Sequence, residues 1–181
     1  MGLFSKRSST TGKRKPRWVI VGPLLVFLIG LALPQYLIIP VKDASEKDWN
    51  PETFWYYPWG KSGTHKGVDI FAREGTAVLS ATYGLVLASY EGGTSGKTLI
   101  FLGPKWRIHF YAHLSTFHTE KWAIVSRGQT IGEVGDTGNA KGKPPHLHYS
   151  LMTALPYPWR MDDAPQGWKK CYVLNPIEYF P

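Results

Sequence analysis

Cysteine is nearly absent from this 181-residue sequence, because Cys171 is the only one. A single thiol excludes an internal disulfide and any zinc site built from a cluster of cysteines. The residues around Cys171 supply neither a base nor a positive charge placed to lower the pKa of the thiol, so a nucleophilic role is not expected. We therefore predict that Cys171 is a packed or partly exposed thiol without a chemical role.

Acidic residues are absent from positions 1–17, which hold six of the 21 lysine and arginine residues. The rest of the chain has 15 basic residues against 13 acidic ones, a net charge of about +2, whereas the whole chain carries +8. A protein that follows nucleic-acid phosphates needs clustered lysine and arginine on its folded domain. The sequence therefore predicts a basic tail at 1–17 and argues against nucleic acid as a partner.

Charged residues are also absent from positions 18–41 (WVIVGPLLVFLIGLALPQYLIIPV). A helix rises about 1.5 Å per residue, so this length suffices to cross a bilayer core, and Trp18 and Tyr36 lie near its two edges. The basic residues before it place the N-terminus in the cytoplasm by the positive-inside rule. We therefore predict a single-pass transmembrane anchor at 18–41. A cleaved signal peptide is the alternative, although the apolar run exceeds the usual length of about 7–15 residues and no small-x-small site follows.

Sustained helical periodicity is missing from the rest of the chain, where short β segments alternate with glycine-containing turns. Residues 42–60 form a linker rich in aromatic residues, which either pack over the domain or form a groove wall or membrane contact. The predicted fold class is mainly β, an antiparallel sandwich or barrel-like core in a domain spanning 61–181. The expected strands are 77–81, 84–90, 98–102, 107–114, 130–134 and 146–152.

Two segments pair histidine with a second potential metal ligand. In PPHLHYS, His146 and His148 flank Leu147, so a strand would point both imidazoles to one face and the leucine to the other. In GTHKGVDI, His65 and Asp69 are four residues apart, and Gly67 allows a tight bend between them. Either pattern alone also fits an ordinary surface pair, so neither is sufficient evidence for a metal site.

A third segment, RIHFYAHL, alternates polar rings with apolar side chains. As a strand it would place His109, Tyr111 and His113 on one face and the apolar residues between them on the other. This arrangement suits a strand that lines a cleft, and a half-exposed strand is the alternative.

Taken together, five segments resemble the M23 (LytM/lysostaphin-like) family of zinc metallopeptidases, from about residue 60 to residue 176. They are GTHKGVDI, EGTAVLSATYGLVLAS, FYAHL, RGQTIGEVGDTGNA and PPHLHYSL, in the order of the family. The resemblance implies that His65, Asp69 and His148 bind Zn²⁺ and that His113 and His146 are catalytic. His109 and His118 match no signature of the family.

The chemistry of these residue types agrees with that implication. Two neutral imidazoles and one carboxylate leave a tetrahedral position open for water, and bound zinc lowers the pKa of such a water to about 7. His113 and His146 could then accept and return the proton and stabilise the oxyanion. A hydrogen-bond acceptor must also hold each ligand imidazole in the right tautomer, and the sequence does not identify these acceptors.

The resemblance implies a zinc metalloendopeptidase that hydrolyses peptide bonds of bacterial peptidoglycan cross-links or stem peptides. The anchor would then lie in the bacterial cytoplasmic membrane, with the peptidase domain on the periplasmic or extracellular side. Glycine-rich turns at 91–96 and 138–142 would border the groove, and the tail at 155–168 would cover one end. One alternative is a non-catalytic LytM-type wall-binding or amidase-activating module, from which ligands or catalytic histidines are expected to be lost. Another is a zinc protease that uses the same site on protein or peptide substrates such as bacteriocins.

Overall fold

The computed structural model describes residues 18–181, so the predicted basic tail at 1–17 lies outside the described residues. One helix, α1 (Trp18–Ala32), precedes a domain built from a single nine-stranded sheet. The strands are β1 (Val68–Phe71), β2 (Ala77–Leu79), β3 (Gly84–Gly92), β4 (Gly96–Gly103), β5 (Arg107–Phe117), β6 (Ile124–Val125), β7 (Thr130–Val134), β8 (His146–Thr153) and β9 (Val173–Leu174). Short 3₁₀ turns lie at Glu46–Asp48, Pro51–Thr53, Gly60–Ser62, Pro104–Trp106, Gly138–Ala140, Pro158–Arg160, Gly167–Cys171 and Pro176–Tyr179.

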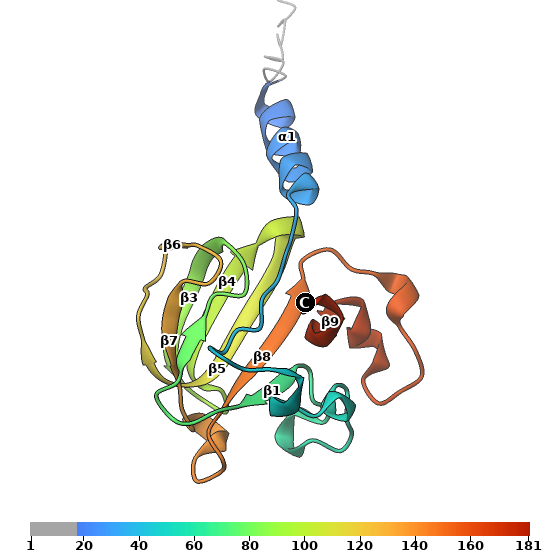
Figure 1. Ribbon diagram of the computed structural model, residues 1–181. Helices are drawn as coiled ribbons and strands as arrows, with labels where there is room; N and C mark the ends of the chain where they lie inside the picture. The colour runs from blue at the N-terminus through green and yellow to red at the C-terminus, as the bar shows by residue number, and fades with distance from the viewer. Residues whose placement is uncertain (1–17) are drawn as a thin grey trace, which may run out of the picture.

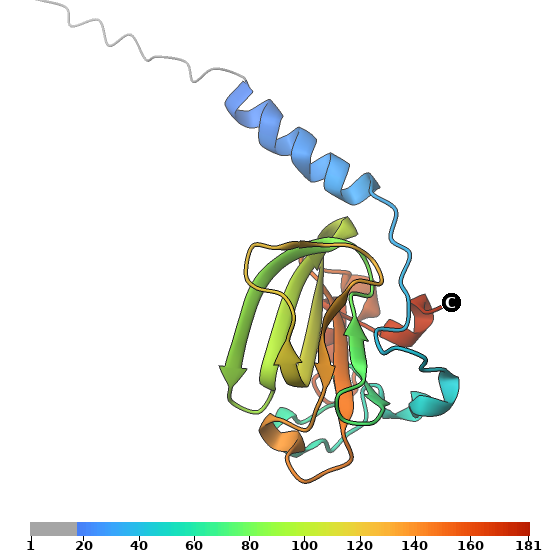
Figure 2. The ribbon, with the colours of Figure 1, turned by 60° about the vertical axis from the view of Figure 1, so that its left-hand side comes forward.

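Every pair of neighbouring strands in the sheet is antiparallel, which confirms the predicted mainly β class. The main path runs β1-β8-β5-β4-β3-β6, while β7 joins β5 to β2 and β9 extends β8. The strands curl around a common core (Figures 1 and 2). The six predicted strands are all present. Strands β1, β6 and β9 were not predicted, because segments of two to four residues show too little alternation to detect.

Strand β5 changes its pairing partner at His113. Residues Arg107 to Ala112 pair with β8, whereas Leu114 to Phe117 pair with β7. His113 adopts a left-handed backbone conformation with φ of 66°, which interrupts the two-residue alternation of the strand.

This interruption makes one prediction wrong, because His109, Tyr111 and His113 do not share a face. The side chains of His109 and Tyr111 are fully buried, and Tyr111 belongs to the apolar core. His113 instead lines a cleft together with Phe110 and Ala112, which were expected on the opposite face.

The segment predicted as an anchor, 18–41, is helical only as far as Ala32. Its last residues belong to the domain: Leu37 and Val41 are buried in the core, and the Ile38 N–H donates to the carbonyl oxygen of Ala81 at 3.0 Å. Among residues 18–181, no helix is both long enough and apolar enough to span a membrane. Helix α1 reaches the domain through Trp106, whose indole N–H donates to the Phe27 carbonyl at 2.9 Å.

The aromatic linker and the C-terminal tail pack against each other. Trp49 meets Phe180 edge to face at 5.6 Å between ring centroids, and the indole N–H of Trp55 donates to the Pro165 carbonyl at 3.1 Å. The side-chain amide of Gln166 donates to the carbonyl oxygen of Ser62 at 2.9 Å. The tail therefore supports the outside of the 59–66 loop. It does not cover the cleft as expected, since the lining residues all lie between positions 58 and 148.

Candidate metal centre and substrate groove

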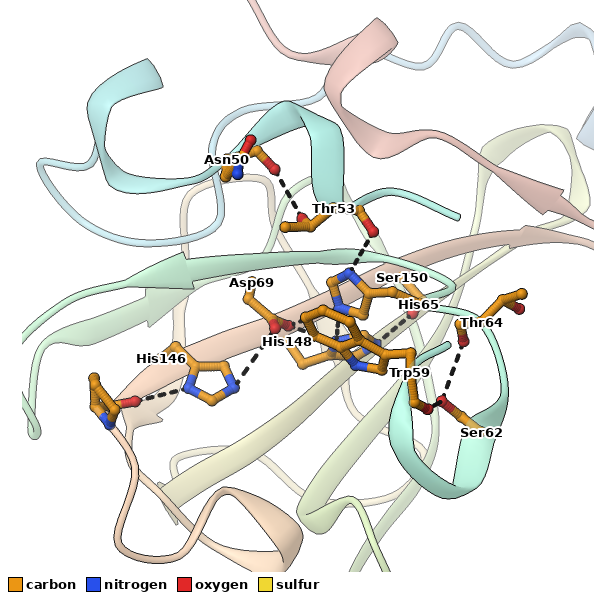
Figure 3. Close-up of polar contacts among 11 residues, drawn as sticks. Asn50, Thr53, Trp59, Ser62, Thr64, His65, Asp69, His146, His148 and Ser150 are labelled. Atoms are coloured by element: carbon orange, nitrogen blue, oxygen red, sulfur yellow. Dashed lines mark hydrogen bonds and ion pairs between the residues drawn. The ribbon is translucent and has the colours of Figure 1, made fainter. Parts of the chain in front are cut away.

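Three predicted metal ligands meet where β1 pairs with β8. Asp69 and His148 are directly opposite each other across the two strands, and His65 comes from the loop before β1. The Oδ1 atom of Asp69 lies 2.7 Å from Nδ1 of His148 and 3.0 Å from Nε2 of His65. The two ring nitrogens are 3.1 Å apart. Figure 3 shows the three side chains converging on one point.

Gly67 allows this close approach of the loop to β8. A Cβ atom at this position would lie 2.6 Å from the carbonyl oxygen of Tyr149 and 2.9 Å from Cε1 of His148. Both distances are shorter than real Cβ contacts, so any larger residue would push β1 and its preceding loop away from β8.

Outer hydrogen bonds orient the two imidazoles, as Figure 3 shows. The Nδ1–H of His65 donates to the carbonyl oxygen of Thr53 at 3.0 Å, and Nε2 of His148 lies 3.0 Å from Oγ of Ser150. The carbonyl partner leaves Nε2 of His65 with a lone pair toward Asp69, and the Ser150 hydroxyl, when it accepts the Nε2–H of His148, leaves Nδ1 of that ring with one. Sequence patterns could not identify the partner of His65, because it is a backbone carbonyl from a distant turn.

The sequence of that turn explains where the Thr53 carbonyl lies. Asn50 caps the Pro51–Thr53 turn by accepting the Glu52 N–H at 3.0 Å, and the Thr53 hydroxyl donates to the Asn50 carbonyl at 2.7 Å. Two backbone hydrogen bonds hold this segment beside the loop that carries His65. The Trp55 N–H donates to the His65 carbonyl at 2.7 Å, and the His65 N–H donates to the Tyr56 carbonyl at 3.1 Å.

The protonation states at this centre suit a divalent cation. Burial raises the pKa of Asp69, but the neighbouring His148 and His65 outweigh burial and hold that pKa well below its usual value. Burial lowers the pKa of His148. One carboxylate and two nitrogen lone pairs thus face a common point, where they repel one another unless a cation lies between them. Two imidazoles and one carboxylate form a donor set that fits Zn²⁺.

The two remaining predicted site residues, His113 and His146, line the same cleft. The Nδ1–H of His113 donates to the Thr137 carbonyl and that of His146 to the Pro144 carbonyl, both at 2.8 Å. Each ring therefore presents Nε2 to the cleft, and the two ring centroids lie 5.0 Å apart. Burial, with the nearby charge of His148, lowers the pKa of His113 to about 4.

The cleft is an open groove with a volume of about 820 Å³. One wall is the 58–66 segment, where Trp59 stacks on the imidazole of His65 at 4.3 Å between ring centroids. The other wall includes Thr94 and Ser95 with the 139–144 turn, joined by a hydrogen bond from the Asn139 N–H to the Thr94 carbonyl at 3.0 Å. The glycine-rich turns therefore border the groove as predicted, and the linker contributes Trp59 to its wall.

The two other histidines from the sequence analysis lie away from the groove. His109 is fully buried against the Tyr149 hydroxyl at 2.7 Å, and burial, with the charge of Arg107, lowers its pKa to about 3. His118 lies at the surface, 3.4 Å from a carboxylate oxygen of Glu133. Both positions agree with their lack of a family signature.

Comparisons with known proteins place this groove in a family. The model of peptidase family M23 matches residues 63–158, more than half of the chain. The L-Ala--D-Glu endopeptidase of Bacillus subtilis is 36% identical over 100 residues, which cover 51% of this chain and 31% of that protein. Peptidoglycan DD-endopeptidase ShyA of Vibrio cholerae is 35% identical over 88 residues, which cover 49% of this chain and 20% of that protein. The match thus spans less than a third of either relative.

Solved structures agree with this assignment. The catalytic domain of lysostaphin from Staphylococcus simulans superposes with a TM-score of 0.57 and 25% identity, over 70% of this chain and 87% of that domain. Csd3 of Helicobacter pylori superposes with a TM-score of 0.53 and 25% identity, over 81% of this chain and 33% of that protein. The family match includes all five residues that converge in the groove. The chain therefore belongs to peptidase family M23, a family of zinc metallopeptidases.

Proposed function

We propose that this chain is a zinc metalloendopeptidase that hydrolyses peptide bonds in bacterial peptidoglycan cross-links or stem peptides. The observation that carries the proposal is the convergence of a metal-fitting cluster and two further imidazoles in one open groove. The activities for which the two relatives are named, L-Ala--D-Glu endopeptidase and peptidoglycan DD-endopeptidase, support the substrate class.

In this proposal His65, Asp69 and His148 hold Zn²⁺. The bound ion supplies Lewis-acid chemistry, polarising the scissile carbonyl and making water more acidic. The chain orients the two imidazoles before the ion binds, because Thr53 and Ser150 contact the ring nitrogens that face away from Asp69. Trp59 covers the outer face of the His65 ring and so limits access of bulk water to that ligand.

His113 and His146 handle protons on the substrate side of the groove. A neutral imidazole accepts a proton from the attacking water through Nε2, and its protonated form then donates to the leaving amine. His113 suits the accepting role, since its lowered pKa keeps the ring neutral near pH 7. A protonated Nε2 on either ring could also donate a hydrogen bond to the oxyanion that develops on the scissile carbonyl.

We also propose that the apolar N-terminal segment holds the domain at the outer face of a bacterial cytoplasmic membrane. Side chains of α1 such as Val21, Leu25 and Leu28 are exposed although they are apolar. The helix meets the domain at Trp106, just after the C-terminal end of β4. The groove lies at the opposite end of this strand, where Thr94 and Ser95 precede its first residue. The groove would therefore face away from the membrane and toward the wall.

The test is digestion of purified peptidoglycan by the full chain in detergent, with zinc and after removal of zinc by a chelator. The expected result is release of new amine ends that depends on zinc, with loss of activity in both H65A and H113A. H113A should retain one zinc ion per chain, whereas H65A should not. Stoichiometric zinc without any new amine ends would identify a non-catalytic module instead and overturn the proposal.

A further inference from the structure

The side chains that line the groove are unbalanced in charge. Among residues 18–181, three lysines line it, Lys61, Lys66 and Lys143, whereas Asp69 is the only lining carboxylate. Asp69 is committed to the metal cluster through His65 and His148. Within residues 18–181, none of the three lysines forms an ion pair with an acidic side chain. The groove is therefore cationic even before a divalent ion is added.

The lysines lie on both sides of the metal cluster. Lys61 and Lys66 belong to the loop that carries Ser62, and Lys143 belongs to the turn that leads into His146, on the other side of Asp69 in Figure 3. The ammonium of Lys66 donates to the carbonyl oxygens of Ser62 at 2.9 Å and Thr64 at 3.2 Å, so its charge is fixed in place. Lys61 and Lys143 are exposed and can reach toward a bound peptide.

Two more lysines, Lys169 and Lys170, lie behind the wall that carries Lys61 and Lys66, and of these Lys169 has no acidic partner among the described residues. Behind the 59–66 loop, the ammonium of Lys170 lies 5.3 Å and that of Lys66 6.0 Å from the centroid of the same ring, Trp55. Lys170 is paired with Asp162, whereas the Lys169 ammonium donates to the neutral amide of Gln166. A concave site lined by charges of one sign concentrates the potential and attracts ligands of the opposite sign.

We propose that the groove selects peptides that carry free carboxylates on the residues flanking the scissile bond, with Lys61 and Lys143 as specificity-determining residues on its two sides. This inference rests on the proposed peptidase function and narrows its substrate class. Peptidoglycan stems whose carboxylates are free fit the groove, while amidated stems and uncharged glycine bridges leave the lysines without partners.

The test compares two forms of one cross-linked stem-peptide dimer, one with free carboxylates and one with the same carboxylates amidated. The full zinc-loaded chain should show a lower KM for the charged form, with a difference that shrinks when salt is raised and screens the charges. K61Q and K143Q should each raise KM for the charged dimer about twofold to fivefold, as expected for partly exposed ion pairs, and leave kcat unchanged. KM for the amidated dimer should not change in either variant.

K141Q is the matched control, because Lys141 lies on the same turn as Lys143, is exposed and does not line the groove. Equal KM values for the two dimers, or an equal effect of K141Q and K143Q, would overturn the inference. Calorimetric titration of both dimers into the zinc-depleted chain measures charge selection without cleavage. It therefore distinguishes failure of this inference from failure of the proposed function. Tighter binding of the charged dimer in this titration, with no cleavage of either dimer by the zinc-loaded chain, would refute the peptidase but support charge selection. Equal binding of the two dimers would refute charge selection.

Discussion

Gly67→Ala is the most direct test of how the fold builds the metal centre. The new methyl group would lie 2.6 Å from the Tyr149 carbonyl oxygen and 2.9 Å from Cε1 of His148, whereas ordinary contacts begin at 3.4 Å. Relief of the closer contact requires a shift of about 0.8 Å between the loop and β8. Zinc–ligand distances tolerate only about 0.2 Å, so His65, Asp69 and His148 could no longer bind one ion with good geometry. We expect zinc affinity to fall at least about tenfold to a hundredfold, as when outer-shell partners are lost.

The assay is competition for zinc with a chromophoric chelator, with thermal unfolding of the metal-free protein measured in parallel. Overpacking is expected to cost about 1–3 kcal/mol of folding stability. Gly132→Ala is the matched control, since its methyl group would also lie 2.6 Å from a carbonyl oxygen, that of Thr116, but on β7 and away from the metal centre. It should lower stability and leave zinc affinity intact. Unchanged zinc affinity in Gly67→Ala, or equal losses in the two variants, would refute the reasoning.

Three further predictions concern single side chains. Ser150→Ala removes the side-chain partner of His148 Nε2, so zinc affinity should fall about tenfold in the same competition assay. An affinity equal to that of the wild type would mean that Ser150 does not orient the His148 ring. His113→Ala should lower kcat by about 10²–10⁴ in a peptide-cleavage assay with one zinc ion retained, and loss of zinc would instead make His113 part of the metal site. The pKa of His109 is about 3 in the folded protein, compared with 6.5 ordinarily, so the unfolded chain binds a proton more readily than the folded one. As the pH falls from 6.5 to about 3, the free energy of unfolding should therefore fall by about 1.4 kcal/mol per pH unit. In chemical denaturation, H109L should flatten this dependence and H118Q should not; equal slopes in H109L and the wild type would contradict the assignment.

Local patterns predicted those parts of the site that depend on strand alternation. Leu147 is fully buried and its neighbours His146 and His148 line the groove, because alternation within β8 depends only on the strand itself. The same rule failed in β5, where the change of partner at His113 puts two consecutive residues, Ala112 and His113, on the groove side. That change depends on β7 and β8, which are distant in sequence, so no pattern within RIHFYAHL could reveal it.

Backbone groups account for much of what the sequence could not predict. The acceptor for His65 is the carbonyl of Thr53, and the acceptors for His113 and His146 are the carbonyls of Thr137 and Pro144. Every residue has such a carbonyl, so residue identity carries no signal for this role.

The end of the predicted anchor was misplaced for a related reason. Leu37 and Val41 are apolar enough for a membrane, and only their contacts with the core distinguish them from a spanning segment.

The partner change in β5 also divides the domain into two parts that can vary separately. The half of β5 before His113 pairs with β8, the half after it pairs with β7, and the 138–145 turn joins β7 to β8. Because β8 pairs with β1 on one side and with β5 on the other, a change in length of that turn need not alter the register of β8 against β1. A designer could therefore exchange the turn, and with it the peptide that the groove accepts, while the metal ligands stay in place.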